Sequence, residues 1–537
     1  MAYKKYSTER CMMCGIAAVV QKPGGATFGA EATAVLERML RALKHRGNRP
    51  PHYAVNNLGG LGCCRLSIVD RSAGGEQPIT GNDGTLIVFN GEIYNYRQLK
   101  RHLIQGGHDF TSDCDTEVIL AGYKEWGVNV VDHLDGMYAF VIADETKGRV
   151  FAARDPVGIK PLYIAEDSKA VYFSSELKSL LVSGCMQPRN INPGYAWING
   201  KLERYANMAV HPRREADEDK KEARKILREK IGASVRERIA TDLPVAVLCS
   251  GGIDSSIVLY EASRVRQVTA FCIGTAPDDP DPQSSQALCQ ELGVDYRFVQ
   301  IEEQALLDSI AKTVAVIESF EPNHIRGGSL SLRLAEAVSQ AGFKVAICGE
   351  GADELFAGYP EFESCLSRSN VDASVRKMVN MFVAQLYRTQ LQRVDRTGMA
   401  YALEVRVPFL DTEVVSYALS LPGAWKISRD AGGILQTKKI LRDSYRGLLP
   451  DAIVDRPKVV LSEGAGVGDN SASGPFYKYA LENAGRHGVS VDDEAKKMFS
   501  IRNAEEEYYL GLFLQVFGAL EEATVRPRVN STAFRSV

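Results

Sequence analysis

Short apolar runs and turn residues predict a strand-rich first part of the chain. Residues 16–20 form an uninterrupted apolar run, and four later runs are also expected to be strands: 86–89, 138–143, 150–153 and 171–174. Apolar positions in residues 31–43 and 116–126 recur with the period of a helix. This arrangement predicts a layered α+β domain, in which helices cover β-sheet.

A different pattern follows the charged stretch of residues 211–221, which predicts a solvated linker. A helix with one apolar face is expected over residues 223–239, and buried strands then alternate with helical segments: 245–249, 268–273 and 344–348. Such alternation predicts a doubly wound parallel sheet, and the chain is mostly helical from about residue 367. We therefore divide the chain as follows: a leader or mis-assigned start at 1–13, a first domain at 14–205, a linker at 206–222 and a second domain at 223–537.

Composition narrows the class of protein. A chain of 537 residues is too long for one core, and a net charge of −3 argues against a generally basic nucleic-acid binder. No apolar stretch approaches the roughly 20 residues that span a bilayer. The first ten residues lack the apolar centre of a secretion signal. Eleven scattered cysteines without zinc-site spacing predict a reduced, cytoplasmic protein.

Cys14 follows Met13 at the head of the first apolar run. As a first residue, Cys14 would carry a thiol nucleophile and an α-amino group that serves as its base. That amine has a pKa of about 7.7–8.0, so it is largely uncharged only near or above neutrality. The alternative is a small buried residue that opens a strand. We expect translation to start at Met13, with removal of that methionine; a cleaved leader is the other route to a free amine.

A glycine-containing loop joins the predicted strand 245–249 to the next helix. In Ser250–Gly251–Gly252–Ile253–Asp254–Ser255–Ser256, the glycines allow a tight turn whose N–H groups converge on an anion. The helix amino terminus and the serine hydroxyl groups add further donors. The alternative is a plain strand-to-helix connection. In this context the loop resembles the pyrophosphate-binding loop of ATP pyrophosphatases, which cleave ATP to AMP and pyrophosphate.

A carboxylate-rich loop, Gly349–Glu350–Gly351–Ala352–Asp353–Glu354, follows the predicted strand 344–348. In a parallel sheet both loops lie at the carboxyl edge, where ligands bind. Asp254 and Asp353 can then share a Mg²⁺ ion that bridges ATP phosphates, because Mg²⁺ prefers oxygen ligands. The alternative is a solvated acidic turn.

From Cys14 to about Glu522 the chain resembles glutamine-dependent asparagine synthetases of the bacterial B type. Further ordered motifs carry this resemblance: RLSIVD at 65–70, NGEIYN at 90–95, DTEVI at 115–119, RD at 154–155, GIKPLY at 158–163, SSELK at 174–178, EVRVPFLD at 404–411 and RPK at 456–458. The resemblance implies an αββα class II glutamine amidotransferase domain of the Ntn-hydrolase type. It also implies an ATP-pyrophosphatase synthetase domain with a helical tail, and a homodimer.

For the first domain, the resemblance implies that Cys14 attacks the side-chain amide of glutamine to give a thioester and ammonia. Asn90 and Gly91 would form the oxyanion hole. Arg65 would hold the glutamine carboxylate, while Glu92 and Asp115 would pair with its amino group. The remaining expected glutamine contacts come from one short segment: Leu66, Ser67, Ile68 and Val69.

For the second domain, the resemblance implies ATP contacts from the strand ends and the loops after them: Leu248, Ser250, Gly251, Gly252, Asp254, Ser255, Ile273, Cys348 and Gly349. Glu350 would support formation of an acyl-adenylate, and Lys458 would stabilise charge that develops during adenylation. Glu318 matches a residue that assists deprotonation as ammonia attacks. Ammonia would pass between the two sites. Asp281 fits a family position to which we assign no role.

The chain departs from the family pattern at one place, and two alternative functions are considered. After His45–Arg46–Gly47 the family usually continues Pro-Asp, whereas this chain has Asn48 and Arg49 in the loop that covers the glutamine site. Related enzymes amidate other acids, so aspartate is the default acceptor and another carboxylic acid is the alternative. A glutamine- or nucleotide-sensing relic would have lost catalytic residues, but these are present.

Overall fold

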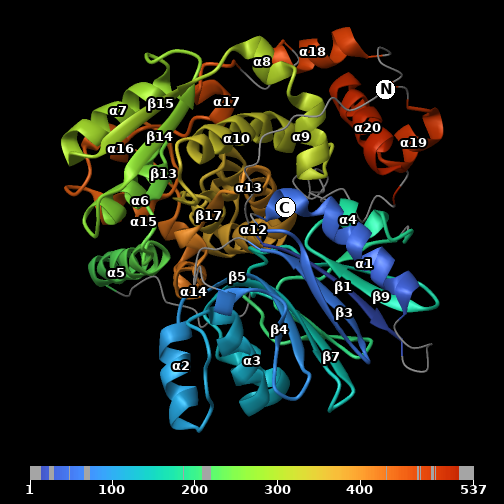
Figure 1. Ribbon diagram of the computed structural model, residues 1–537. Coiled ribbons are helices and arrows are strands. Elements are labelled where there is room, and N and C mark those ends of the chain that lie inside the picture. The colour runs from blue at the N-terminus through green and yellow to red at the C-terminus, as the bar shows by residue number, and fades with distance from the viewer. Residues whose placement is uncertain are drawn as a thin grey trace.

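Two domains pack against each other, the first drawn below and the second above in Figure 1. The computed structural model describes these residues: 14–22, 29–47, 49–65, 73–185, 187–208, 219–430, 432–468, 471, 473–484, 489, 491–518 and 520. The predicted linker is only partly within these ranges. Its last three residues are helical, because α5 (Lys220–Arg238) begins at Lys220, where the Asp219 side chain accepts a hydrogen bond from the Lys221 N–H group.

The first domain holds two six-stranded sheets stacked face to face. One has the order β10 (Arg189–Asn190), β8 (Tyr163–Glu166), β9 (Ala170–Ser174), β1 (Gly15–Gln21), β3 (Gly59–Cys64), β2 (His52–Asn56). The other has the order β12 (Lys201–Arg204), β11 (Tyr195–Ile198), β7 (Arg149–Arg154), β6 (Gly136–Asp144), β5 (Leu86–Ile93), β4 (Ile79–Thr80). All strands predicted for this domain are confirmed, several of them longer than expected.

Alternation along β1 explains the layers. Ile16, Ala18 and Val20 lie in the core between the two sheets, while Ala17 and Val19 face the opposite way, toward the helical layer. That layer consists of α1 (Ala30–Ala42) and α4 (Leu177–Leu181), and the other sheet is covered by α2 (Tyr96–Gln105) and α3 (Asp115–Trp126). Because successive strand residues point to opposite faces, a wholly apolar strand must be buried on both sides. The predicted αββα architecture is confirmed.

The second domain is built on a five-stranded parallel sheet. Its order is β15 (Asp295–Gln300), β14 (Thr269–Gly274), β13 (Val245–Leu248), β16 (Val345–Ile347), β17 (Glu404–Arg406). The connecting helices include α5, α6 (Ile253–Ser263), α7 (Pro280–Leu292), α8 (Glu303–Leu307), α9 (Ile310–Ile317) and α10 (Pro322–Gln340). The predicted doubly wound domain is thus confirmed, and its carboxyl edge gathers the loops after β13, β14 and β16.

Two strands of this sheet were not predicted. In β15, most residues are exposed or only partly buried, so it lacks the apolar run that marked its neighbours. The edge strand β17 is short and charged: Glu404 and Arg406 are buried, and they pair with each other at 2.7 Å. A sequence pattern of hydrophobicity misses such a strand, because its burial depends on partners elsewhere in the chain.

The rest of the second domain is mostly helical, as predicted. Its helices are α11 (Ala352–Leu355), α12 (Val371–Gln385), α13 (Gln390–Met399), α14 (Thr412–Ser420), α15 (Lys439–Tyr445), α16 (Asp451–Val454), α17 (Leu461–Gly464), α18 (Pro475–Asn483), α19 (Asp493–Met498) and α20 (Ala504–Phe517). A two-stranded ribbon, β18 (Ser428–Arg429) with β19 (Leu435–Gln436), interrupts them. None of the helices described is long and apolar enough to cross a membrane.

Candidate active sites

Cys14 stands immediately before β1, near the border between the two domains. Its side chain is half-buried, and its backbone carbonyl accepts a hydrogen bond from Arg46 Nε at 3.2 Å. A hydrogen bond with Cys14, together with burial, raises the pKa of the neighbouring Cys63 thiol. Residues 1–13 lie outside the described residues, so the free amine at Cys14 stays a prediction.

Asn90 and Gly91 lie side by side on β5, the strand next to β6. Asn90 is 2% exposed, and its Nδ2 atom has no hydrogen-bond partner among the residues that the structure describes. Gly91 has φ of 151°, and a Cβ atom there would lie 1.9 Å from the Met137 carbonyl oxygen. Only glycine therefore fits at this position, next to the Asn90 amide.

Of the residues predicted to bind glutamine, the structure describes Arg65 and Asp115 but not the segment 66–69. Arg65 is almost fully buried, and its Nη1 atom lies 3.2 Å from Glu76 Oε1, a partner that the sequence did not indicate. Asp115 opens α3, accepts a hydrogen bond from the Ile93 N–H group at 3.1 Å, and has its pKa raised to about 6 by burial. The predictions for Leu66, Ser67, Ile68 and Val69 fall outside the described residues.

Glu92 makes an ion pair across the domain border. Its Oε1 atom lies 3.3 Å from Arg406 Nη2 on β17, and burial raises its pKa while the Arg406 charge opposes that shift. In the sequence, Arg406 belongs to the motif at 404–411, but the sequence did not indicate which residue it contacts. The pair therefore joins the predicted glutamine pocket to an edge strand of the other domain.

The loop after β13 has the tight turn that the sequence predicted. Ser255 Oγ accepts a hydrogen bond from the Ser250 N–H group at 3.2 Å and lies 3.3 Å from Ser250 Oγ. The loop after β16 packs directly on it, since a Cβ atom at Gly349 would lie 2.8 Å from both Asp254 Cβ and the Ser255 nitrogen. The structure thus brings together two loops that are almost a hundred residues apart in the chain.

Asp254 and Asp353 share one lysine side chain, and Asp353 also contacts a second lysine. Lys438 Nζ lies 2.5 Å from Asp254 Oδ2 and 2.7 Å from Asp353 Oδ1, and Lys458 Nζ lies 2.8 Å from Asp353 Oδ2. Burial raises the pKa of Asp254, whereas at Asp353 the two ammonium groups outweigh burial and lower the pKa. Asp254 Oδ1 is buried without a hydrogen-bond partner among the described residues. The two carboxylates, one with an orphaned oxygen, fit a Mg²⁺ ion.

Lys438 was missed by the sequence analysis. It is 1% exposed and has φ of 55°, in the left-handed region just before α15. Non-glycine residues seldom adopt that conformation, and its occurrence at a buried charge is typical of a functional position. The only available signal was a Lys-Lys pair that opens a helix.

Arg456 explains the position of Asp281. Its guanidinium donates to the Ser250 carbonyl at 3.0 Å and to Asp281 Oδ1 at 2.7 Å. Asp281 therefore fixes Arg456, and Arg456 ties the segment that carries Lys458 to the Ser250 loop. The motif at 456–458 and the Ser250 loop, which were predicted separately, are thus joined by hydrogen bonds.

Most of the other residues predicted for the second domain lie at the carboxyl edge of the parallel sheet, whereas Glu318 does not. Leu248 is the last residue of β13, and Ile273 is the last but one of β14. Cys348 follows β16, and Glu350 pairs with Arg393 of α13. Glu318, at the end of α9, accepts hydrogen bonds from the N–H groups of Leu177 and Lys178, both at 2.9 Å. These contacts place Glu318 at the domain border. Among the described residues, no hydrogen bond or ion pair links it to Asp254 or Asp353.

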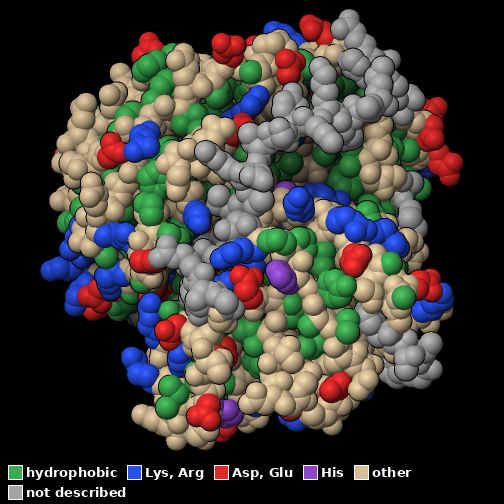
Figure 2. Space-filling model, viewed as in Figure 1, with side chains coloured by type: hydrophobic (Ala, Val, Ile, Leu, Met, Phe, Trp, Pro, Cys, Tyr) green, Lys and Arg blue, Asp and Glu red, His purple; other side chains and the backbone are tan. Residues whose placement is uncertain are grey.

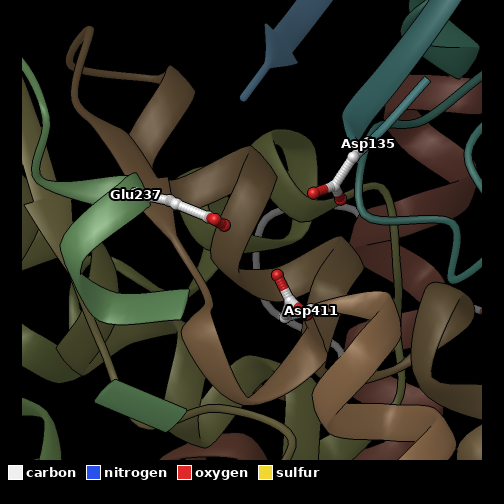
Figure 3. A group of neighbouring side chains, drawn as sticks. All are labelled: Asp135, Glu237 and Asp411. Carbon is white, nitrogen blue, oxygen red and sulfur yellow. The ribbon is translucent and has the colours of Figure 1, made fainter. Parts of the chain in front are cut away.

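An acidic cluster at the border is not part of either predicted site. Figure 3 shows the carboxylates of Asp135, Glu237 and Asp411 pointing toward one another, with ligand atoms within 4.8 Å. Asp411 pairs with Arg238 Nη1 at 2.8 Å and caps α14. Burial raises the pKa of Asp135 to about 6. Arg238 offsets part of the negative charge of this cluster.

A hollow of about 420 Å³ lies on the outer surface between α5 and α6. Lysine and arginine side chains gather in Figure 2 on the side where Figure 1 places α5. The charged residues that line the hollow are Lys225, Arg228, Glu229, Arg236, Glu261 and Arg264. Because Arg264 pairs with Glu261 at 3.5 Å, acidic groups offset part of the positive charge.

Comparison with known proteins agrees with this two-site arrangement. Residues 13–195 match the glutamine amidotransferase domain family, and residues 226–372 and 367–495 match the asparagine synthase family. A glutamine-hydrolyzing asparagine synthetase of Sandersonia aurantiaca is 32% identical over 480 residues, which cover 84% of this chain and 87% of that protein. One from Zea mays is 31% identical over 527 residues, which cover 94% of this chain and 86% of that protein. The chain therefore belongs to the family of glutamine-hydrolysing asparagine synthetases.

Proposed function

We propose that this protein makes asparagine from aspartate, with glutamine as the nitrogen donor and ATP as the source of energy. The products are asparagine, glutamate, AMP and pyrophosphate. One observation carries the proposal: a single chain holds a half-buried Cys14, an Asn90 amide nitrogen without a hydrogen-bond partner among the described residues, and a Ser250 loop whose Asp254 shares Lys438 with Asp353.

In the first domain, Cys14 Sγ attacks the side-chain carbonyl carbon of glutamine. The Asn90 Nδ2 and Gly91 N–H groups donate to the oxygen of the tetrahedral intermediate, which then expels ammonia and leaves a thioester. Water hydrolyses the thioester to glutamate. Arg65 binds the glutamine carboxylate, while Glu92 and Asp115 bind its ammonium group; opposed charges suit a zwitterion. Leu66, Ser67, Ile68 and Val69 complete the pocket.

In the second domain, a carboxylate oxygen of aspartate attacks the α-phosphorus of ATP, and pyrophosphate leaves. Lys458 stabilises the charge that develops on the phosphate, and Glu350 supports the acyl-adenylate. Ammonia then attacks the mixed anhydride and AMP leaves. The role of Glu318 in deprotonating that ammonia rests on the resemblance alone. The nucleotide is held by the strand ends and loops: Leu248, Ser250, Gly251, Gly252, Ser255, Ile273, Cys348 and Gly349.

Asp254 and Asp353 would hold Mg²⁺ at the phosphates. When bound, such an ion would supply positive charge that offsets the negative charge of the phosphates. The fit rests on the buried Asp254 oxygen without a partner and on the shared contact of both carboxylates with Lys438. Lys438 would add a positive charge beside the two carboxylates.

The acceptor is tested by measuring AMP release from ATP with aspartate and with other small carboxylic acids, each in the presence of glutamine. Aspartate should give the highest kcat/KM, with asparagine formed in equal amount to AMP. A protein that aspartate does not stimulate, but that another acid does, would have the alternative function of amidating that acid.

Asn90→Ala should lower kcat for glutamine hydrolysis by about 10²–10³-fold, because one of two oxyanion donors is lost. Asparagine formation from added ammonium chloride should stay unchanged, since that reaction bypasses the first domain. Steady-state assays of glutamate and asparagine on the same preparation provide both numbers. Equal losses in the two assays would mean that Asn90 acts on the fold.

Glutamine binding should weaken in acid because of Asp115. Its pKa is raised to about 6 by burial, so the carboxylate becomes neutral below that pH and no longer attracts an ammonium group. KM for glutamine hydrolysis should therefore rise as pH falls from about 7 to 5, while Asp115→Asn should have a high KM that varies less with pH. A wild-type KM that stays constant through this range would refute the role.

We also propose a cytoplasmic homodimer. None of the ten described cysteines forms a disulfide, which supports a reducing compartment. Light scattering at several protein concentrations tests the oligomeric state.

A further inference from the structure

One arginine of the first domain connects Cys14 to the second domain. Arg46 is fully buried, and its Nη1 atom donates to Glu176 Oε1 at 2.6 Å. Nη1 and Nη2 also bind the two oxygens of Asp395 on α13, at 2.9 and 3.1 Å, while Nε donates to the Cys14 carbonyl. Every nitrogen of this guanidinium is therefore used, and the partners come from both domains.

The contacts continue from Asp395 back to the first domain. Arg396 Nη1 donates to Asp395 Oδ2 at 2.9 Å, and Arg396 Nη2 donates to Glu318 at 3.1 Å. Glu318 accepts the N–H groups of Leu177 and Lys178, which directly follow Glu176. The result is a closed ring of contacts that crosses the domain border twice.

Charge within this ring is balanced. Arg46, Arg396 and Lys178 face Glu176, Asp395 and Glu318, and all but Lys178 are at most 4% exposed at the side chain. Although burial opposes it, Arg46 lowers the pKa of Asp395, so that carboxylate is charged at neutral pH. Removing one member of a buried ion network leaves a charge without compensation, and this costs more than the network contributes.

Asp395 has a specific part in this arrangement. Glu176 contacts Arg46 only through Nη1 and Oε1, which leaves the guanidinium plane free to rotate. The paired contacts of Asp395 with Nη1 and Nη2 fix that plane, because a carboxylate and a guanidinium match as two parallel hydrogen bonds. With the plane fixed, Nε points to the carbonyl of Cys14.

We propose that Asp395 is a positioning residue for the glutaminase: it orients Arg46, and Arg46 holds the Cys14 backbone so that its thiol faces the bound amide. The inference rests on the proposed role of Cys14 as nucleophile. A displacement of about 1 Å can cost roughly 10²-fold in rate. The glutaminase site is thus completed by a carboxylate of the synthetase domain.

Asp395→Asn in the full-length protein tests this inference. The amide keeps the shape of the side chain but removes its charge and one of the two acceptors. We expect kcat for glutamine hydrolysis to fall about 10- to 100-fold, with KM for glutamine changed less than threefold. The rate of Cys14 alkylation by iodoacetamide should change with it, and asparagine formation from ammonium chloride should stay within twofold of wild type.

A second variant and a matched control separate positioning from general damage. Arg46→Lys keeps the charge but lacks the planar fork, so it should show the same loss of kcat. Glu505→Gln breaks another buried carboxylate–arginine pair, with Arg326, inside the second domain. It should lower the melting temperature as Asp395→Asn does, yet leave glutamine hydrolysis at the wild-type rate.

Wild-type hydrolysis and alkylation rates in both Asp395→Asn and Arg46→Lys would overturn the inference. So would an equal loss of the ammonia-dependent reaction, since that would mean a defect of the whole fold. Glutamine hydrolysis is measured without aspartate, so a wrong acceptor gives a different result: the wild type hydrolyses glutamine but forms no asparagine.

Discussion

Cys14→Ala protein should make asparagine from ammonium chloride at the wild-type rate and make almost none from glutamine. The substitution removes the proposed nucleophile, so glutamine hydrolysis should fall at least about 10⁴-fold. Adenylation does not use this thiol. The residues proposed for adenylation lie at the carboxyl edge of the parallel sheet, in loops of the other domain.

The measurement is asparagine formation with each nitrogen donor in turn, together with glutamate release. Cys63→Ala is the matched control, because that thiol lies beside Cys14 and is fully buried. It should retain glutamine hydrolysis. If Cys14→Ala kept the glutamine-dependent reaction, another group would be the nucleophile and the proposed thioester would be wrong.

Asp353→Asn should strongly slow the synthetase reaction with either nitrogen donor. Asp353 contacts both Lys438 and Lys458 and is a proposed Mg²⁺ ligand, and the two ammonium groups lower its pKa. An amide there loses the negative charge that faces both ammonium groups, and it binds Mg²⁺ poorly. We expect aspartate-dependent AMP release to fall about 10³-fold.

Glutamine hydrolysis in the same Asp353→Asn preparation is the internal control and should persist. Asp308→Asn, an exposed carboxylate in the same domain, should leave AMP release unchanged. Titration with Mg²⁺ gives a second measurement: more Mg²⁺ should be needed for half-maximal activity. Unchanged AMP release in Asp353→Asn would remove Asp353 from the proposed metal site.

Local sequence patterns predicted most of the architecture, because in most strands and helices the buried residues recur at regular spacing along the chain. The all-apolar run of β1 must be covered on both faces, and the 3.6-residue period of α1 gives one buried face, with Leu36, Met39 and Leu40. The strands that escaped prediction, β15 and β17, have no such repetition. In β17 the buried residues Glu404 and Arg406 satisfy each other and reach Glu92 of the other domain.

The sequence by itself determined the two kinds of chemistry, since Cys14, the Ser250 loop and the Asp353 loop each carry their residue types within a short segment. Only the tertiary structure decided their partners: Lys438 between the aspartates, Arg406 against Glu92, and Asp395 behind Arg46. The physical reason is that charge interactions act through space and have no period along a chain. A buried arginine such as Arg46 finds its carboxylate 349 residues away, and no local pattern records that distance.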